Sequence, residues 1–167
     1  NQLHCEQRGE KAENPAYPHQ IHENTIPHGG SFLEDGNTSE EDKLIFETNK
    51  ILHSNIAVSA TVARVPVYGG HSESVNVEFS QHYDIQEITK ILENTPGVIV
   101  ADNPNKNLYP TPLMAYDKDE VFVGRIRRDN SIENGLNFWV VTDNIRKGAA
   151  TNAVEIAEIL LKLNDAI

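Results

Sequence analysis

Two side chains that can do chemistry flank a break in the backbone near the middle of this 167-residue chain. Arg64 precedes the break at Pro66, and His71 directly follows Gly69-Gly70. Proline cannot donate to a central strand, and glycine adopts backbone angles that are closed to other residues. Such a corner can direct a guanidinium that holds an anion and an imidazole that transfers a proton into one cleft. The same pattern also fits two ordinary surface residues.

A second pair of charged residues lies on a predicted helix that precedes this corner. Thr38 and Glu41 have the spacing of a capping box, and acidic residues follow Thr38, so we predict a helix over residues 38–52. Glu40 and Lys43 are three positions apart and share one face of this helix. The simplest interpretation is an exposed ion pair, worth only about 0.5 kcal/mol.

Strands and helices are both predicted along the rest of the chain. Strands are expected over residues 57–65, 74–79, 98–101, 121–128 and 136–142, and further helices over residues 84–94 and 147–163. The apolar alternation in 121–128 loses phase, which indicates a bulge, and 102–112 is expected to be a loop. This order predicts an α+β fold in which a mixed β-sheet carries helices on one face.

The apolar pattern also predicts which side chains are buried. Trp139 is expected in the core, and the inward-facing helix residues are expected to be Ile85, Ile88, Ile91 and Leu92, then Ala149, Ala150, Ala153, Ile156, Ala157, Leu160 and Leu161. The strand at 136–142 is almost wholly apolar, as is typical of a strand covered on both faces. The chain offers no obvious cover for it, so we expect a homodimer with sheet-to-sheet contact. The basic cluster Arg125, Arg127 and Arg128 fits a solvated strand face.

Composition restricts the classes of partner. The chain has 14 Lys plus Arg against 25 Asp plus Glu, a formal charge of −11, which argues against nucleic acid or an anionic membrane. No apolar run has membrane-spanning length and no signal-peptide pattern opens the chain, so a cytoplasmic protein is expected. Cys5, the single cysteine, cannot form an internal disulfide, and no metal site is predicted. Asn1 is an unusual first residue, so we expect a domain cut from a longer protein.

Three stretches of the chain resemble the aspartate-semialdehyde dehydrogenase family. They are SEEDKLIFETNKIL, IAVSATVARVPVYGGHSESVNVEF and DEVFVGRIRRDNSIENGLNFWVVTDNIRKGAATNAVEIAEIL. The resemblance implies a fold like the C-terminal domain of glyceraldehyde-3-phosphate dehydrogenase. It implies that residues 17–167 are a substrate-binding and dimerisation domain with the C-terminal helix, and that residues 1–16 are a polar linker or the tail of a preceding helix. Enzymes of this family reduce β-aspartyl phosphate with NADPH to aspartate semialdehyde and phosphate, toward lysine, threonine, methionine and diaminopimelate.

The resemblance also implies a role for each candidate residue. Arg64 matches the arginine that binds the substrate's α-carboxylate, and His71 matches the general acid/base. Glu40 matches the glutamate that contacts the substrate's amino group, and Lys43 matches the lysine near the leaving phosphate. Asn144 stands where the family often has a glutamine that contacts NADP.

The chain departs from the family pattern at the nucleophile and at the cofactor loop. Cys5 lies in LHCEQ, which lacks the family's context for the catalytic cysteine, and the Gly-Gly pairs lack the spacing of a dinucleotide-binding loop. Without a thiolate and a hydride donor, the chain alone is predicted to be inactive. Two alternatives stay open: a stand-alone dimerisation module without catalysis, and a domain of N-acetyl-glutamyl-phosphate reductase, which the RVPV–HSES corner fits less well.

Overall fold

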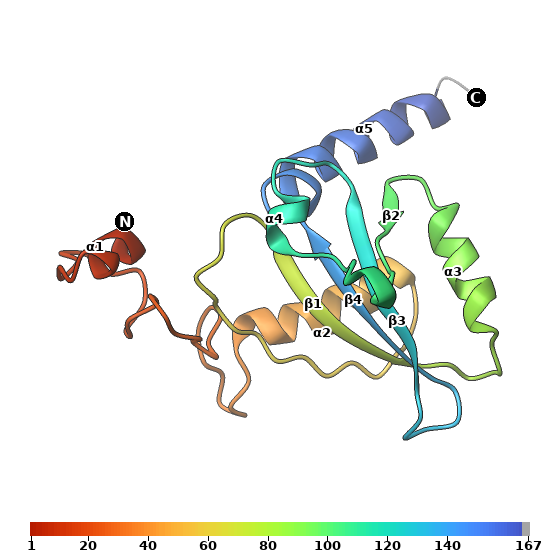
Figure 1. The fold of residues 1–167 in the computed structure, drawn as a ribbon, viewed down its shortest axis with the longest axis horizontal. Helices are drawn as coiled ribbons and strands as arrows, with labels where there is room; N and C mark the ends of the chain where they lie inside the picture. Colours follow the sequence, from red (N-terminus) through yellow and green to blue (C-terminus); the bar gives the residue numbers. More distant parts are fainter. Residues whose placement is uncertain (165–167) are drawn as a thin grey trace. The chain divides into compact units, whose positions relative to one another are not determined.

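The computed structural model describes residues 1–164 and divides into two compact units (Figure 1). The first unit comprises Asn1–Pro66, and the second begins at Val67. Within residues 1–164, no helix combines the length and the apolar character needed to cross a bilayer.

The first unit begins with a short helix, α1 (Gln2–Gln7). Side chains of this helix form hydrogen bonds with the backbone of residues 17–22. Gln2, which is buried, donates to the carbonyls of Tyr17 and His19 at 3.4 and 3.1 Å. The Glu6 carboxylate accepts two backbone N–H bonds from the same stretch, at 2.9 and 2.8 Å. The polar N-terminal segment is therefore bonded to the segment that follows it.

Helix α2 (Ser39–Leu52) begins where the capping box predicts. The Thr38 hydroxyl accepts from the N–H of Glu41 at 3.4 Å, and the Glu41 carboxylate accepts from the N–H of Thr38 at 2.7 Å. The helix ends at His53, whose left-handed backbone has a φ of 47°. The helix predicted over 38–52 is confirmed.

Residues 57–65 do not form the predicted strand. Among the described residues, their one ladder contact is an antiparallel bridge between Ile26 and Arg64, with N–H···O distances of 3.0 and 2.8 Å. The N–H of Val62 bonds to the Glu41 carboxylate rather than to another strand. A run of β-branched residues favours extended backbone, but a partner strand decides whether a sheet forms.

The second unit is built on a four-stranded mixed sheet in the order β1-β4-β3-β2 (Figure 1). The strands are β1 (His71–Glu78), β2 (Val98–Val100), β3 (Val121–Asp129) and β4 (Gly135–Thr142). β4 pairs antiparallel with β1 and β3, whereas β2 and β3 are parallel. The α+β class with a mixed sheet is confirmed, and β1 begins three residues before its predicted start.

Strand β3 contains the predicted bulge. Its register against β4 shifts between Gly124 and Arg127. Arg125 lies in the shifted stretch with a φ of 56°, a left-handed conformation that is uncommon for a residue with a side chain. The bulge changes the direction of the arginines that follow Gly124.

Short helices and a small core surround the sheet. Helix α3 (Ile85–Glu93) is capped by Asp84 and packs along β2 and β3, although Ile91 is 57 % exposed and does not face inward as predicted. The expected loop 102–112 contains a 3₁₀ turn (Pro104–Lys106) and leads into α4 (Pro112–Ala115). The core consists of Ala115, Phe122 and Val141, with Met114 and Trp139 packed against it. Trp139 is thus half-buried at the edge of the core.

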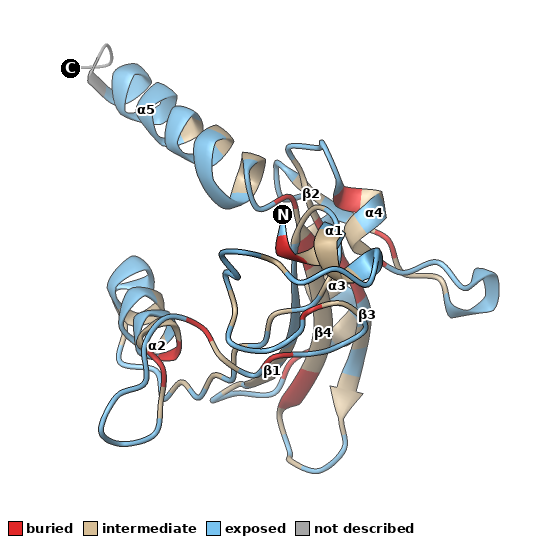
Figure 2. Cartoon of the chain, turned by 90° about the vertical axis from the view of Figure 1, so that its left-hand side faces the viewer, coloured by how far each residue is buried: buried red, intermediate tan, exposed pale blue. Residues whose placement is uncertain are grey.

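The last helix is present, but its predicted burial is wrong. A π-helical turn (Arg146–Ala150) leads into α5 (Thr151–Asn164). The seven residues expected to face inward are all exposed: Ala149, Ala150, Ala153, Ile156, Ala157, Leu160 and Leu161. Figure 2 shows α5 in the colour of exposed residues along most of its length. An apolar helix face is buried only where a second surface meets it, and no described residue of the second unit supplies that surface for these seven.

Candidate functional site

The candidate residues of the second unit lie at one end of the β1–β4 pair. His71 is the first residue of β1, and its register partner is Thr142, the last residue of β4. Asn144 follows two positions later, and both His71 and Asn144 are exposed. An imidazole and an amide that are accessible to solvent at the same strand end can both reach a bound molecule.

The candidate residues of the first unit include an ion pair that sequence spacing does not predict. The Nη2 atom of Arg64 donates to Oε1 of Glu40, and the two side chains are 34 % and 36 % exposed. Lys43 is exposed, and within residues 1–164 no ion pair joins it to Glu40. The simple Glu40–Lys43 pair is therefore wrong. A half-exposed guanidinium beside a carboxylate is complementary to the carboxylate and ammonium groups of an α-amino acid.

Two residues that the sequence did not identify as part of the site support this ion pair. The Glu41 carboxylate accepts the N–H of Val62 at 2.8 Å, which ties the start of α2 to the segment that carries Arg64. N–H donation from Val62 and then from Thr38 lowers the pKa of Glu41. Gly29 lies under Glu40, where a Cβ atom would come within 2.5 Å of Oε2. The capping-box spacing identifies Glu41 but not its long-range bond.

Replacing Glu41 with glutamine is expected to lower the melting temperature of the chain by roughly 3–8 °C at pH 7. The lowered pKa means that Glu41 stabilises the fold above its unfolded pKa of about 4.3, and that this contribution is lost as pH falls through the folded pKa. The difference in melting temperature between wild type and Glu41→Gln should therefore shrink toward pH 3. Calorimetry over pH 3–7 measures this difference.

Glu47→Gln is the matched control, because Glu47 is an exposed glutamate on the same helix. It should leave the melting temperature nearly unchanged at every pH. A difference for Glu41→Gln that stays constant from pH 7 to pH 3 would contradict the assigned role of the carboxylate.

Glycines allow His71 to occupy its place at the strand end. Gly70 has a φ of 98°, and a Cβ atom there would lie 2.6 Å from the Thr142 carbonyl oxygen. The imidazole itself lies over Gly148 in the π-helical turn, where a Cβ atom would be 3.6 Å from Nδ1. The sequence indicates the need for glycine at the corner, but it gives no sign that Gly148 is a neighbour of His71.

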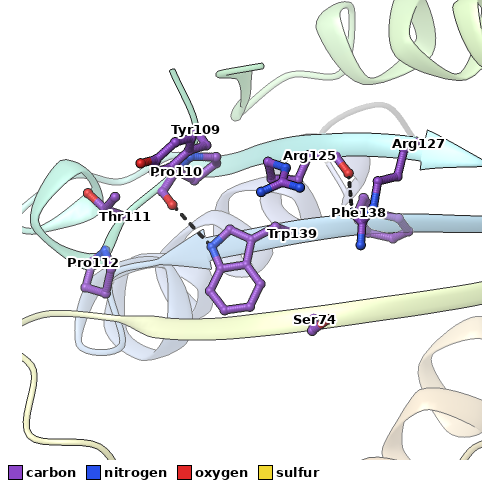
Figure 3. Close-up of a pocket in the computed structure, with 9 residues that line it drawn as sticks. All are labelled: Ser74, Tyr109, Pro110, Thr111, Pro112, Arg125, Arg127, Phe138 and Trp139. Carbon is purple, nitrogen blue, oxygen red and sulfur yellow. Dashed lines mark hydrogen bonds between the residues drawn. The ribbon is translucent and has the colours of Figure 1, made fainter. Parts of the chain in front are cut away.

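A hollow of about 340 Å³ lies on the sheet of the second unit (Figure 3). Its lining includes Tyr109, Arg125, Arg127 and Trp139, and the Trp139 indole donates to the carbonyl of Pro110 at 3.2 Å. None of the five candidate site residues lines it. Within residues 1–164, no cluster of three or more His, Cys, Asp or Glu side chains could hold a metal ion.

The four-stranded mixed sheet with its accompanying helices defines the class as an α+β domain, and an exposed histidine and asparagine lie at its β1–β4 end. A family model described as "Semialdehyde dehydrogenase, dimerisation domain" matches residues 1–147, and the chain belongs to this family. The resemblance to aspartate-semialdehyde dehydrogenase seen in the sequence is confirmed, for the dimerisation domain of that protein.

The similar proteins are about twice as long as this chain. An aspartate-semialdehyde dehydrogenase of Aquifex aeolicus is 58 % identical over 147 residues, which cover 87 % of this chain and 43 % of that protein. The Bacillus subtilis protein of the same name is 47 % identical over 148 residues, with the same two coverages. The chain therefore spans less than half the length of these relatives.

Solved structures show the same fold. Aspartate semialdehyde dehydrogenase II of Vibrio cholerae, complexed with ASA, matches with a TM-score of 0.89 and 42 % identity, over 96 % of this chain and 48 % of that one. The Candida albicans enzyme with NADP matches with a TM-score of 0.68 and 28 % identity, over 89 % of this chain and 47 % of that one.

Proposed function

We propose that this chain is the substrate-binding and dimerisation half of an aspartate-semialdehyde dehydrogenase. The complete enzyme would convert β-aspartyl phosphate and NADPH to aspartate semialdehyde, phosphate and NADP in the cytoplasmic synthesis of lysine, threonine, methionine and diaminopimelate. The observation that carries the proposal is the Arg64–Glu40 ion pair, in a chain that is 58 % identical to a relative of that name. Residues 17–167 would form the domain, and residues 1–16 the linker or helix tail before it.

The substrate would replace the mutual contact of Arg64 and Glu40. The guanidinium binds the α-carboxylate through two parallel hydrogen bonds, which fix its orientation as well as its charge. The Glu40 carboxylate, which the guanidinium has released, then accepts hydrogen bonds from the α-ammonium group. The exposed ammonium of Lys43, one turn along α2, binds the leaving phosphate. Each ionic group of the substrate would thus meet a side chain of opposite charge.

His71 would act as the general acid/base beside the reacting carbon. An imidazole titrates near neutral pH, so His71 can take the proton of an attacking thiol and return a proton during turnover. The thiol and most of the NADP site would come from the cofactor-binding half, and NADP, when bound, supplies the hydride. Asn144, exposed at the turn after β4, would contact the cofactor through its amide.

Two apolar surfaces that are fully or partly exposed support contacts with further domains. Six large apolar side chains of α5 are 51–64 % exposed: Val154, Ile156, Ile159, Leu160, Leu161 and Leu163. Exposed apolar area of this kind marks an interaction surface, so we propose that α5 packs against the cofactor-binding half. The half-buried stretch Phe138–Val140 and the hollow beside it would meet a second copy of the chain in a homodimer.

Purified chain and full-length protein test this proposal together. Size-exclusion chromatography with light scattering should show the chain alone as a dimer at micromolar concentration. The same fractions should not consume NADPH with β-aspartyl phosphate, whereas the full-length protein should. Sustained turnover by the chain alone would refute the division of labour between the halves, and a clean monomer would refute the sheet-to-sheet contact. A full-length protein that accepts only N-acetyl-glutamyl phosphate would belong to the sister enzyme.

A further inference from the structure

Two segments from distant parts of the second unit lie close to the corner that carries His71. The π-helical turn places Gly148 beside the imidazole. Gly69, two residues before His71, packs so closely against Tyr116 that a side chain at Gly69 would collide with the tyrosine ring. The place of the corner and of its imidazole therefore depends on where these two segments lie.

One buried carboxylate bonds to both segments. Asp143, which is 5 % exposed, accepts the N–H of Asp117 at 2.9 Å through Oδ2. Its Oδ1 accepts the N–H groups of Ile145 and Arg146 at 2.8 and 3.0 Å. Its main-chain carbonyl accepts the N–H of Gly148 at 2.9 Å. Donation from the N–H of Arg146 and then of Asp117 lowers the pKa of Asp143 despite its burial, so the carboxylate stays ionised.

A second link between these segments is weaker. Arg146 pairs with Asp117 at 2.6 Å and with Asp119 at 3.2 Å, and the Thr151 hydroxyl donates to Asp119 at 2.7 Å. All these groups except Thr151 are 40 % exposed or more, so water and salt weaken their contribution. The buried Asp143 is the central link between residues 116–117 and the turn 145–148.

We propose that Asp143 is a positioning residue for His71: by bonding to the π-helical turn and to Asp117, it fixes the turn beside the imidazole and the segment against which Gly69 packs. The effect of Asp143 on turnover rests on the proposed acid/base role of His71, whereas its effect on the position of the imidazole does not. A residue that merely caps the turn would stabilise the fold without changing the environment of a histidine on another strand. π-helical turns are frequent at functional sites, and this one lies directly under the candidate acid/base.

Nuclear magnetic resonance of the imidazole Cε1–H signals in the 167-residue chain tests the proposal directly. His71→Asn identifies the His71 signal among the seven histidines. In Asp143→Asn, one oxygen becomes an NH2 group that cannot accept an N–H, so the turn beside the imidazole should move and the His71 signal should shift. The signals of histidines outside this corner should stay in place.

Two further variants keep this test decisive. Gly148→Ala adds a methyl group 3.2 Å from the Asp143 carbonyl oxygen and 3.6 Å from Nδ1 of His71, so the turn must move slightly and the same signal should shift. Asp129→Asn is the control, because Asp129 also binds a backbone N–H, that of Ser131, but lies at the opposite end of the sheet. A His71 signal that is identical to wild type in Asp143→Asn would overturn the proposal even if Gly148→Ala shifts it, as would a shift of the same size in Asp129→Asn.

Kinetics of the full-length enzyme separate this inference from the proposed function. Asp143→Asn should lower kcat roughly 10- to 100-fold with little change in KM, because misplacing a catalytic group weakens proton transfer more than binding. If His71→Asn retains full kcat, the acid/base role fails, whereas the spectra still decide whether Asp143 positions the ring. If His71→Asn loses activity but Asp143→Asn has normal kcat and KM, the positioning role is refuted.

Discussion

Replacing His71 with asparagine in the full-length enzyme should lower kcat at least about 100-fold, while KM for β-aspartyl phosphate changes little. Asparagine keeps a polar group of similar reach but cannot exchange a proton near neutral pH. The loss should therefore fall on the step in which the thiol gives up its proton and not on substrate binding. Initial rates measured by NADPH consumption, with varied β-aspartyl phosphate, separate kcat from KM.

The matched control for this substitution is His82→Asn. His82 is an exposed histidine of the same unit and lies just before α3, away from the β1–β4 end. It should retain wild-type kcat, and its kcat should have the same pH dependence. Normal kcat in His71→Asn would remove His71 from the mechanism and would leave the strand end without a proton carrier.

Replacing Arg64 with alanine should raise KM for β-aspartyl phosphate roughly 10- to 100-fold, with a much smaller change in kcat. Arg64 would contact the α-carboxylate, which does not change charge during the reaction. Its hydrogen bonds therefore stabilise the bound substrate and the transition state to similar extents. Loss of the guanidinium also leaves Glu40 without its present partner, which adds to the loss of binding.

Two comparisons make the Arg64 result specific. Arg64→Lys keeps the positive charge but cannot form two parallel hydrogen bonds, so its KM should lie between those of wild type and Arg64→Ala. Arg8→Ala removes an arginine of the same unit that pairs with Glu10 on an exposed surface, and it should leave KM unchanged. If Arg64→Ala lowers kcat and leaves KM unchanged, Arg64 is not the carboxylate ligand.

The elements that the sequence predicts well are those specified by local chemistry. The capping box at Thr38 and Glu41 marks the start of α2, Asp84 marks the start of α3, and the loss of alternation in 121–128 marks the bulge. Each signal involves neighbours within a few residues, so it acts in the same way in any tertiary context.

Burial and pairing could not be predicted in the same way, because they depend on residues far away in the chain. The run 57–65 has strand propensity, but the carboxylate of Glu41 takes the N–H of Val62 in place of a partner strand. Periodicity predicts that the apolar stripe of α5 faces the interior. The stripe is exposed, because no described residue packs over it. Propensity and periodicity report only what a segment can bury, and not what surface it meets.

The sequence by itself determined the residue types at the site, the family resemblance and the glycine corner that precedes His71. Only the tertiary structure decided which groups meet: Glu40 with Arg64 instead of Lys43, and the imidazole of His71 with Gly148. It also decided that Asp143 joins the turn beside that ring to Asp117. The physical reason is that hydrogen bonds and ion pairs form between atoms a few ångströms apart, and folding alone sets those distances between residues dozens of positions apart in sequence.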